Sequence, residues 1–236
     1  MGIYTELGEV FHANKNLIPE ITKSYQGKAT SNSSFGYQVI DSYKARAPSF
    51  DHLFRLFTEA AQNRFVWKRS SLKSGELLDN TSNSVTGDCA QLARMLILLA
   101  QLPHPYGAGL AGNFEIVTYS GKYNKGFISN HEREILRLKA NTRLINSEQP
   151  TCYLWENHKV VSHNGKFYDP CYNKTYQKLE EMAEYEITQD TGQSCKATHC
   201  EMRTSHSFKT TSFLEYEETP PLECEETRST NLCLIQ

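Results

Sequence analysis

The stretch Thr86–Pro103, TGDCAQLARMLILLAQLP, is the most apolar segment of the chain, and the fold prediction starts from it. Its apolar residues lie almost all round a helix, a pattern typical of a buried helix. They are Leu92, Met95, Leu96, Ile97, Leu98 and Leu99. Thr86 or Asp88 is expected to be the N-cap, because a side-chain oxygen there accepts a hydrogen bond from the first turn. Cys89 then lies in that first turn.

Two interpretations of Cys89 follow from this position. An unpaired cysteine is commonly a small buried apolar residue. At a helix N-terminus, however, the dipole and the unpaired N–H groups favour a thiolate, which is the nucleophilic form of cysteine. The same N–H groups can stabilise an oxyanion on an attacked carbonyl. None of the other six cysteines is expected at such a helix start.

A predicted hairpin further along the chain distinguishes two candidate histidines, His158 and His163. Asn164-Gly165 separates two β-prone runs, and this dipeptide favours a two-residue turn because both residues tolerate positive φ. Such a turn pairs His163 with Lys166, Ser162 with Phe167, Val161 with Tyr168 and Val160 with Asp169. Since side chains alternate between faces, His158 is expected on the face of Asp169, within side-chain reach, and His163 on the opposite face.

A carboxylate beside an imidazole fixes its tautomer and supports its protonated form. His158 and Asp169 therefore complement a cysteine nucleophile: the thiolate attacks, the histidine takes and returns a proton, and the aspartate orients the histidine. The structural alternative is a surface pair on neighbouring strands with no third partner.

Composition excludes some classes of function. The chain has 236 residues, a net charge of −2 and no basic patch of the kind that nucleic-acid binding needs. No apolar window is long enough for a membrane span, and no secretory signal is expected at the N-terminus. Seven cysteines at irregular spacings favour reduced thiols and a cytosolic location. Cys195, His199 and Cys200 lack a second ligand pair, so neither a metal nor a cofactor is predicted.

Two segments of the sequence resemble a known family. The segment GDCAQLARMLILLAQLP is similar to the nucleophile helix of the transglutaminase-like superfamily of papain-like cysteine enzymes. The segment ENHKVVSHNGKFYDP is similar to the histidine and aspartate strands of that superfamily. The resemblance covers residues 84–172 and implies that Cys89 is the nucleophile, His158 the general base and acid, and Asp169 the orienting carboxylate. It also implies an α+β fold whose nucleophile helix packs on an antiparallel sheet.

The spacing departs from the compact bacterial members of the superfamily. Nearly seventy residues separate the cysteine from the histidine, which implies an insertion over about 107–146. Asn83 and Trp67 are the candidates for the oxyanion-hole donor. We expect an N-terminal extension over 1–48, a catalytic domain over 49–190, and a C-terminal region over 191–236 that ends in an acidic tail.

Local patterns predict several further elements. A helix over 49–67 is expected from the spacing of its apolar residues, with Ser49 as its cap. We expect a strand in 114–121 and an amphipathic helix over 129–145. Residues 1–48 have a polar, mixed composition with a Ser/Asn-rich loop, and we expect a loop over 74–88.

Several acyl-transfer reactions share a Cys-His-Asp set. Hydrolysis needs the least additional machinery, so we expect a cysteine hydrolase that acts on a protein substrate, as a protease or a glutamine deamidase. A transglutaminase or other acyltransferase differs only in using an amine as the second nucleophile. A catalytically inactive binding module of the same fold, or an adaptor anchored by its tail, is the alternative from another class.

The last four residues, Cys233-Leu234-Ile235-Gln236, fit the prenylation pattern, with glutamine favouring a farnesyl group on Cys233. A single prenyl chain gives only weak membrane association. Prenylation takes place in a eukaryotic cytosol, whereas the catalytic motifs resemble bacterial ones. A bacterial effector delivered into host cells reconciles the two, and the glutamate-rich tail is similar to the C-terminal signals of type IV secreted effectors.

Expression in a eukaryotic cell tests the role of the tail. Part of the chain is expected in the membrane fraction, and Cys233→Ser is expected to abolish this partition because the prenyl acceptor is lost. Fractionation followed by immunoblotting measures it, with Cys89→Ala as a control that leaves the tail intact. Equal partition of the parent chain and Cys233→Ser contradicts the prediction.

Overall fold

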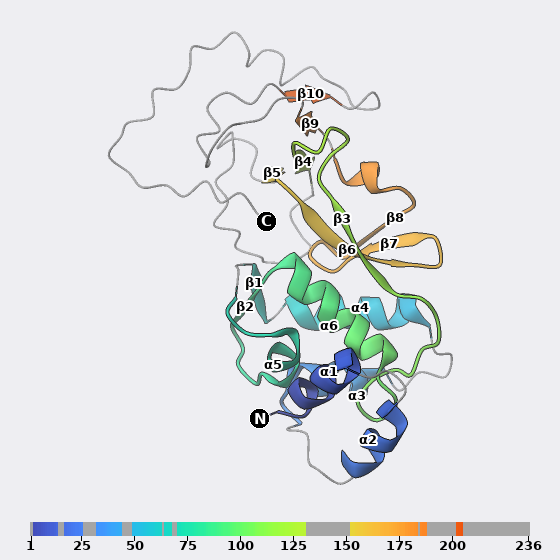
Figure 1. The fold of residues 1–236 in the computed structure, drawn as a ribbon. Coiled ribbons are helices and arrows are strands. Elements are labelled where there is room, and N and C mark those ends of the chain that lie inside the picture. Colours follow the sequence, from blue (N-terminus) through green and yellow to red (C-terminus); the bar gives the residue numbers. More distant parts are fainter. Residues whose placement is uncertain are drawn as a thin grey trace. The chain divides into compact units, whose positions relative to one another are not determined.

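The structure is a computed structural model that describes residues 2–13, 17–25, 32–43, 49–62, 64–67, 70–130, 152–183, 185–187 and 202–204 (Figure 1). Its α-helices are α1 (Ile3–Ala13), α2 (Ile18–Tyr25), α3 (Phe35–Ser42), α4 (Phe50–Gln62), α5 (Ser74–Asp79) and α6 (Cys89–Gln101). A 3₁₀ turn, η2, covers Leu179–Met182. The strands are β1 (Phe65–Trp67), β2 (Val85–Gly87), β3 (Glu115–Tyr119), β4 (Phe127–Asn130), β5 (Cys152–Trp155), β6 (His158–His163), β7 (Lys166–Asp169), β8 (Lys174–Tyr176), β9 (Tyr185–Ile187) and β10 (Met202–Thr204).

The strands of the described residues form three sheets. β1 and β2 make a parallel pair, one four-stranded sheet has the order β3-β6-β7-β8, and the other has the order β10-β9-β4-β5. The hairpin β6–β7 and the pairs of the last sheet are antiparallel. The predicted α+β class is therefore confirmed.

The chain divides into two compact units. The first takes in helices α1–α6, the pair β1–β2, and β6 from Lys159 onward with β7. The second takes in the sheet β10-β9-β4-β5 and His158, the first residue of β6. In the first unit, α6 contacts α4 and α5, and α1 contacts α2 and α5. Among the described residues, no helix is both long enough and apolar enough to cross a bilayer.

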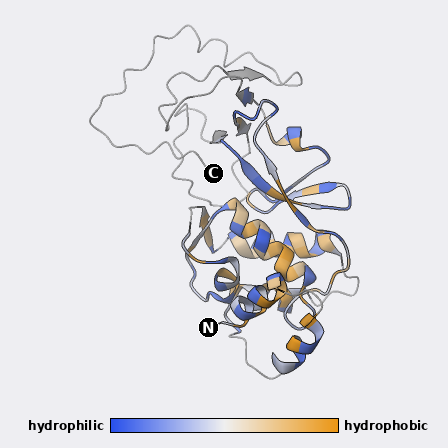
Figure 2. Ribbon diagram, in the orientation of Figure 1, coloured by the Kyte–Doolittle hydropathy of each residue, from blue (hydrophilic) through white to orange (hydrophobic). Residues whose placement is uncertain are grey.

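Helix α6 is the buried centre of the first unit. Its largely apolar character is visible in Figure 2, and of its apolar residues Leu92, Met95, Leu96 and Leu99 have no exposed area. The following segment satisfies the carbonyls of its last turn: the N–H groups of Ala108 and Leu110 donate to the carbonyl oxygens of Leu99 and Ala100. The carbonyl groups at the C-terminal end of the helix therefore find partners within the unit, as burial of a helix end requires.

The N-terminal residues carry more structure than the sequence pattern predicted. Residues 1–48 were expected to be mixed and loop-rich, yet α1, α2 and α3 lie within them. Three of their large side chains, Tyr4, Leu7 and Phe35, are almost fully buried. The helices are only 8 to 11 residues long, so their apolar periodicity extends over too few turns to stand out.

Two other element predictions need correction. The helix predicted over 49–67 ends at Gln62, and Phe65 lies in β1, because β1 pairs with β2 and this pairing outweighs the helical spacing. The expected loop at 74–88 contains α5 and β2. The cap is confirmed, since Ser49 Oγ accepts a hydrogen bond from His52 N at 3.2 Å.

The hairpin prediction is confirmed for the turn and for three of the four predicted pairs. Asn164 and Gly165 both have positive φ, 49° and 74°. The register pairs Val161 with Tyr168, Ser162 with Phe167 and His163 with Lys166. The strand predicted in 114–121 is β3. Most of the helix predicted over 129–145 lies outside the described residues, and its first two residues belong to β4.

A carboxylate distant in sequence caps α1. Asp79, the last residue of α5, accepts hydrogen bonds from Tyr4 N at 3.1 Å, Thr5 N at 2.9 Å and Thr5 Oγ1 at 3.0 Å. The two helices approach closely at Gly75, where an added Cβ would lie 2.7 Å from the Cα of Thr5. Asp79 therefore does for α1 what a local N-cap residue does for most helices.

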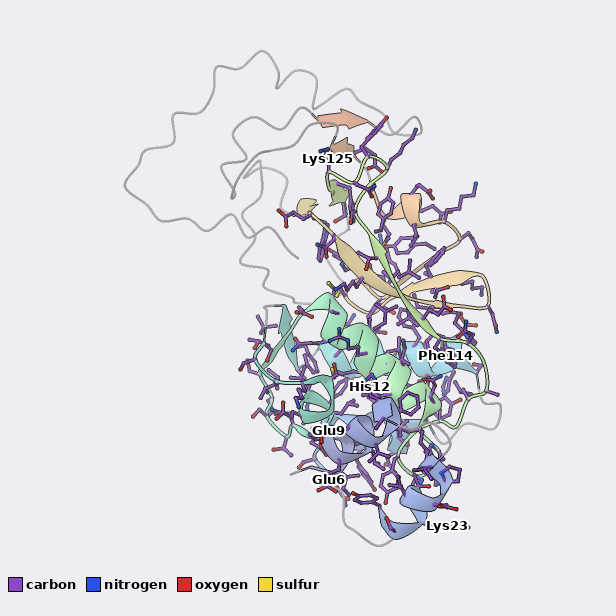
Figure 3. All side chains as sticks on the ribbon, viewed as in Figure 1. Glu6, Glu9, His12, Lys23, Phe114 and Lys125 are labelled. Carbon is purple, nitrogen blue, oxygen red and sulfur yellow. The ribbon has the colours of Figure 1, made fainter. Side chains whose placement is uncertain are left out.

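Two acidic residues of α1 contact side chains of other segments (Figure 3). Glu6 accepts a hydrogen bond from Tyr25 Oη at 2.5 Å, and Glu9 pairs with Lys73 Nζ at 3.3 Å. The pair with Lys73 is exposed, so it contributes little to stability.

Removal of the Asp79 carboxylate is expected to destabilise the first unit. We predict that Asp79→Ala lowers the free energy of unfolding by about 1–2 kcal/mol, because first-turn donors lose their acceptor. Urea denaturation followed by circular dichroism measures the change. Glu59→Ala removes an exposed i,i+4 partner of Arg55 and is the control, with an expected loss of less than about 0.5 kcal/mol. Equal losses in the two variants contradict the capping role.

Candidate functional site

Cys89 is the first residue of α6, as predicted, and it has no exposed area. The N-cap is Asp88: its Oδ1 accepts a hydrogen bond from Gln91 N at 2.8 Å, and Gln91 Oε1 accepts one from Asp88 N at 2.9 Å. This reciprocal pair is a capping box. The N–H groups of Cys89 and Ala90 have no acceptor within the helix, because the residues four positions earlier precede it.

The short strand β2 leads directly into the N-cap of α6. β2 ends at Gly87, and the parallel register places Trp67 of β1 beside Gly87. Gly87 needs to be small, since an added Cβ would lie 3.2 Å from the ring of Phe65. Of the two oxyanion candidates, the backbone of Trp67 lies at the end of β1–β2 that leads into Cys89, whereas Asn83 is exposed and precedes the opposite end. Their roles stay predictions.

Gln91 also forms hydrogen bonds with the segment before α5. Its Nε2 donates to the carbonyl oxygens of Leu72, at 2.5 Å, and Ser70, at 3.3 Å. A single side chain thus connects the first turn of α6 to the 70–72 segment. The sequence analysis did not identify Gln91, although its place three residues after Asp88 matches the capping-box pattern.

Asp169 ends β7 and starts a tight turn. It has no exposed area, and its Oδ1 accepts a hydrogen bond from Cys171 N at 2.9 Å. Its carbonyl oxygen accepts one from Tyr172 N at 3.3 Å. A side chain that bonds the backbone two residues later is an Asx-turn, which returns the chain sharply. The turn holds the fully buried Cys171 beside the Asp169 carboxylate.

His158 begins β6 and is 1% exposed. Its ring packs on the indole of Trp155, with ring centroids 4.0 Å apart, and the indole N–H donates to Ser129 Oγ at 2.9 Å. His158 belongs to the second unit and Asp169 to the first, so the pairing of these two side chains stays a prediction.

Cys171 is the residue that the sequence analysis missed. Burial first, and then the negative charge of Asp169, raises the pKa of the Cys171 thiol well above its usual range; Cys89 and Asp88 act in the same direction. The available signal was the DPC sequence, in which a cysteine follows the candidate aspartate by two residues.

His163, rejected on strand parity, has a different environment. Its ring stacks on Phe114 with centroids 4.1 Å apart and packs edge-on against Phe50. Its Nδ1 is 3.0 Å from the carbonyl oxygen of Asn113. These contacts explain its burial by packing.

The other candidate residues lie outside the described part of the chain. They are Cys195, His199 and Cys200 of the metal pattern that was considered and Cys233 of the prenylation pattern. Comparison of the chain with protein-family models, curated proteins and solved structures gives no match. The resemblance to transglutaminase-like enzymes therefore stays a prediction from the motifs around Cys89 and His158.

The raised pKa of Cys171 predicts how this thiol reacts. Only the thiolate is alkylated, so in the native protein Cys171 is expected to react with iodoacetamide only at strongly alkaline pH. Because a neighbouring negative charge raises a thiol pKa, Asp169→Asn should lower it and move the midpoint of the pH profile to lower pH. Peptide mass spectrometry of alkylated Cys171 gives the profile. Glu59→Gln is the control, and an unchanged midpoint in Asp169→Asn contradicts the prediction.

Proposed function

We propose that this chain is a cysteine hydrolase of the transglutaminase-like, papain-like kind, acting on a protein substrate through Cys89, His158 and Asp169. The observation that carries the proposal is the place of Cys89, buried in the first turn of the capped helix α6. His158 begins β6 and the buried Asp169 ends β7, the two strands of the hairpin that the motif predicted. A buried helix start, an imidazole and a carboxylate are the parts that thiol acyl transfer uses.

In the proposed mechanism, His158 takes the proton of the Cys89 thiol and the sulfur attacks an amide carbonyl carbon. The oxyanion lies against the N–H groups of Cys89 and Ala90, which have no intrahelical acceptor. The C–N bond breaks as His158 returns the proton to the leaving amine or ammonia. Water, losing a proton to His158, then attacks the thioester; the C–S bond breaks, and Cys89 regains its proton as the carboxylic acid product leaves.

Cys89 is the better nucleophile of the two neighbouring cysteines. The raised pKa of Cys171 keeps this thiol protonated at neutral pH, and only a thiolate attacks. Cys171 also shares a tight turn with Asp169, whereas Cys89 lies at the positive end of a 13-residue helix. We therefore assign the acyl-carrying role to Cys89 and none to Cys171.

The complete burial of Cys89 favours a second candidate, a catalytically inactive binding module with the same fold. A nucleophile needs access to its substrate, whereas a core thiol does not. The two candidates differ in whether Cys89 becomes acylated.

Acylation of the purified full chain by p-nitrophenyl acetate distinguishes the candidates. We expect one acetyl group on Cys89, seen by peptide mass spectrometry, and its loss in Cys89→Ala. His158→Ala is expected to slow acylation by about 10²–10⁴-fold, because the general base is removed. Cys171→Ala is the matched thiol control and should still be acylated. Proteomics of cells that express the parent chain or Cys89→Ala then separates deamidation of glutamine from new protein termini.

Slow acetylation spread over several cysteines, unaffected by His158→Ala, favours the binding module and contradicts the enzyme. Circular dichroism of each variant establishes that a loss of acylation does not reflect unfolding. Transfer of the acyl group to an added primary amine in preference to water would assign the acyltransferase reaction instead.

A further inference from the structure

We propose that the turn over 120–126, which joins β3 to β4, docks on an anionic lipid bilayer through Lys122, Tyr123 and Lys125. The whole turn lies within the second unit, and it is the link between β3 and β4 in Figure 1. Its sequence, SGKYNKG, carries two positive charges, and 116–131 contains no aspartate or glutamate. The turn is therefore basic, although the chain as a whole has a net charge of −2. We call 120–126 the basic turn.

The tip of the basic turn presents a lysine and a tyrosine to solvent. Lys122, Tyr123 and Asn124 are exposed, and Lys125, labelled in Figure 3, is half-buried. Among the described residues, the exposed large apolar side chains are those of Leu17 and Tyr123, and Tyr123 is the more exposed of the two at 48%. The Lys122 ammonium lies 5.7 Å from the centroid of the Tyr123 ring, close enough for a cation to be attracted to the ring. A positive charge and an aromatic ring therefore meet an incoming surface together.

A buried carboxylate holds the basic turn in place. Glu186 of β9 is 4% exposed, and its oxygens accept hydrogen bonds from Lys122 N at 2.7 Å and from Tyr119 Oη at 2.5 Å. Gly121 has a φ of 77°, and an added Cβ there would lie 2.3 Å from the carbonyl oxygen of Gly126. The shape of the turn is thus set within the second unit, so binding to a surface costs little ordering of its backbone.

An anionic bilayer suits this combination of side chains. Tyrosine and lysine are typical of membrane interfaces, where the ring lies at the level of the headgroups and the ammonium stays near the lipid phosphates. A lysine near an anionic leaflet strengthens binding by about fivefold, so the pair is worth roughly 30-fold. The net negative charge of the chain opposes this weakly, because charges more than about 8 Å from the surface are screened at physiological salt. Nucleic acid is a poorer fit, since it calls for a longer basic patch or stripe.

Docking through the basic turn is independent of the proposed hydrolase and adds to the farnesyl group predicted on Cys233. A single prenyl chain gives weak association, and stable anchoring takes a second signal. Two lysines and one ring also bind weakly when they act alone. Loss of the prenyl group is therefore still expected to remove the chain from a washed membrane fraction.

Co-sedimentation with vesicles tests the basic turn, with the full chain purified from bacteria so that Cys233 carries no prenyl group. We expect roughly 30-fold stronger partition onto vesicles with about one-third phosphatidylserine than onto pure phosphatidylcholine. High salt should reduce this difference. Lys122→Glu/Lys125→Glu should abolish it, because the attraction becomes a repulsion. Tyr123→Ala should weaken binding to the anionic vesicles at low and at high salt alike, since the ring enters the interface irrespective of charge.

A matched charge reversal in the first unit supplies the control. Lys23 and Lys73 are exposed there, and Lys23→Glu/Lys73→Glu changes the net charge by the same amount. This variant should bind the anionic vesicles within about twofold of the parent chain, since only charges near the surface act on it. Circular dichroism establishes that each variant is folded.

Three results would overturn the docking site. The first is equal partition of the parent chain onto the two kinds of vesicle, and the second is an equal loss in the two double variants. The third is binding of a short RNA, followed by fluorescence anisotropy, that depends on Lys122 and Lys125 while vesicles are not bound; this would assign the basic turn to nucleic acid instead.

Discussion

The first unit depends on one constraint: α6 is buried, and its terminal backbone groups still need hydrogen-bond partners. An apolar helix can be enclosed on all sides only if its terminal N–H and C=O groups find partners, because water is not available to them. The Asp88–Gln91 capping box meets this need at one end, and the backbone of Ala108 and Leu110 meets it at the other. Gln91 extends the same network to Leu72. The position of Cys89 is a consequence, since the residue after the cap is fixed with the helix.

The first unit holds two thiols with different properties, those of Cys89 and Cys171. Cys171 shares a turn with a buried carboxylate, and its thiolate is disfavoured by burial and by charge. Cys89 lies at a helix start, where backbone N–H groups are directed toward incoming negative charge.

Prediction from sequence succeeded where the physical cause is local. Asn164-Gly165 dictates a turn with two positive φ angles, and the turn then dictates the register of β6 and β7. Asp88 and the apolar run dictate α6 in the same way. It failed for α1, whose cap is the carboxylate of Asp79 more than seventy residues away, and for Phe65, whose strand partner is Val85. Such partners cannot be identified from a single local pattern.

The sequence by itself determined the start of α6, the hairpin, and the strand parity that separates His158 from His163, because hydrogen-bond geometry and side-chain alternation act over a few residues. Only the tertiary structure decided that Cys171 is buried beside the Asp169 carboxylate, where burial and charge raise the pKa of its thiol. The reason is that burial and charge act through space. A raised thiol pKa or a set of converging donors depends on which segments pack together, and no spacing along the chain encodes that distance.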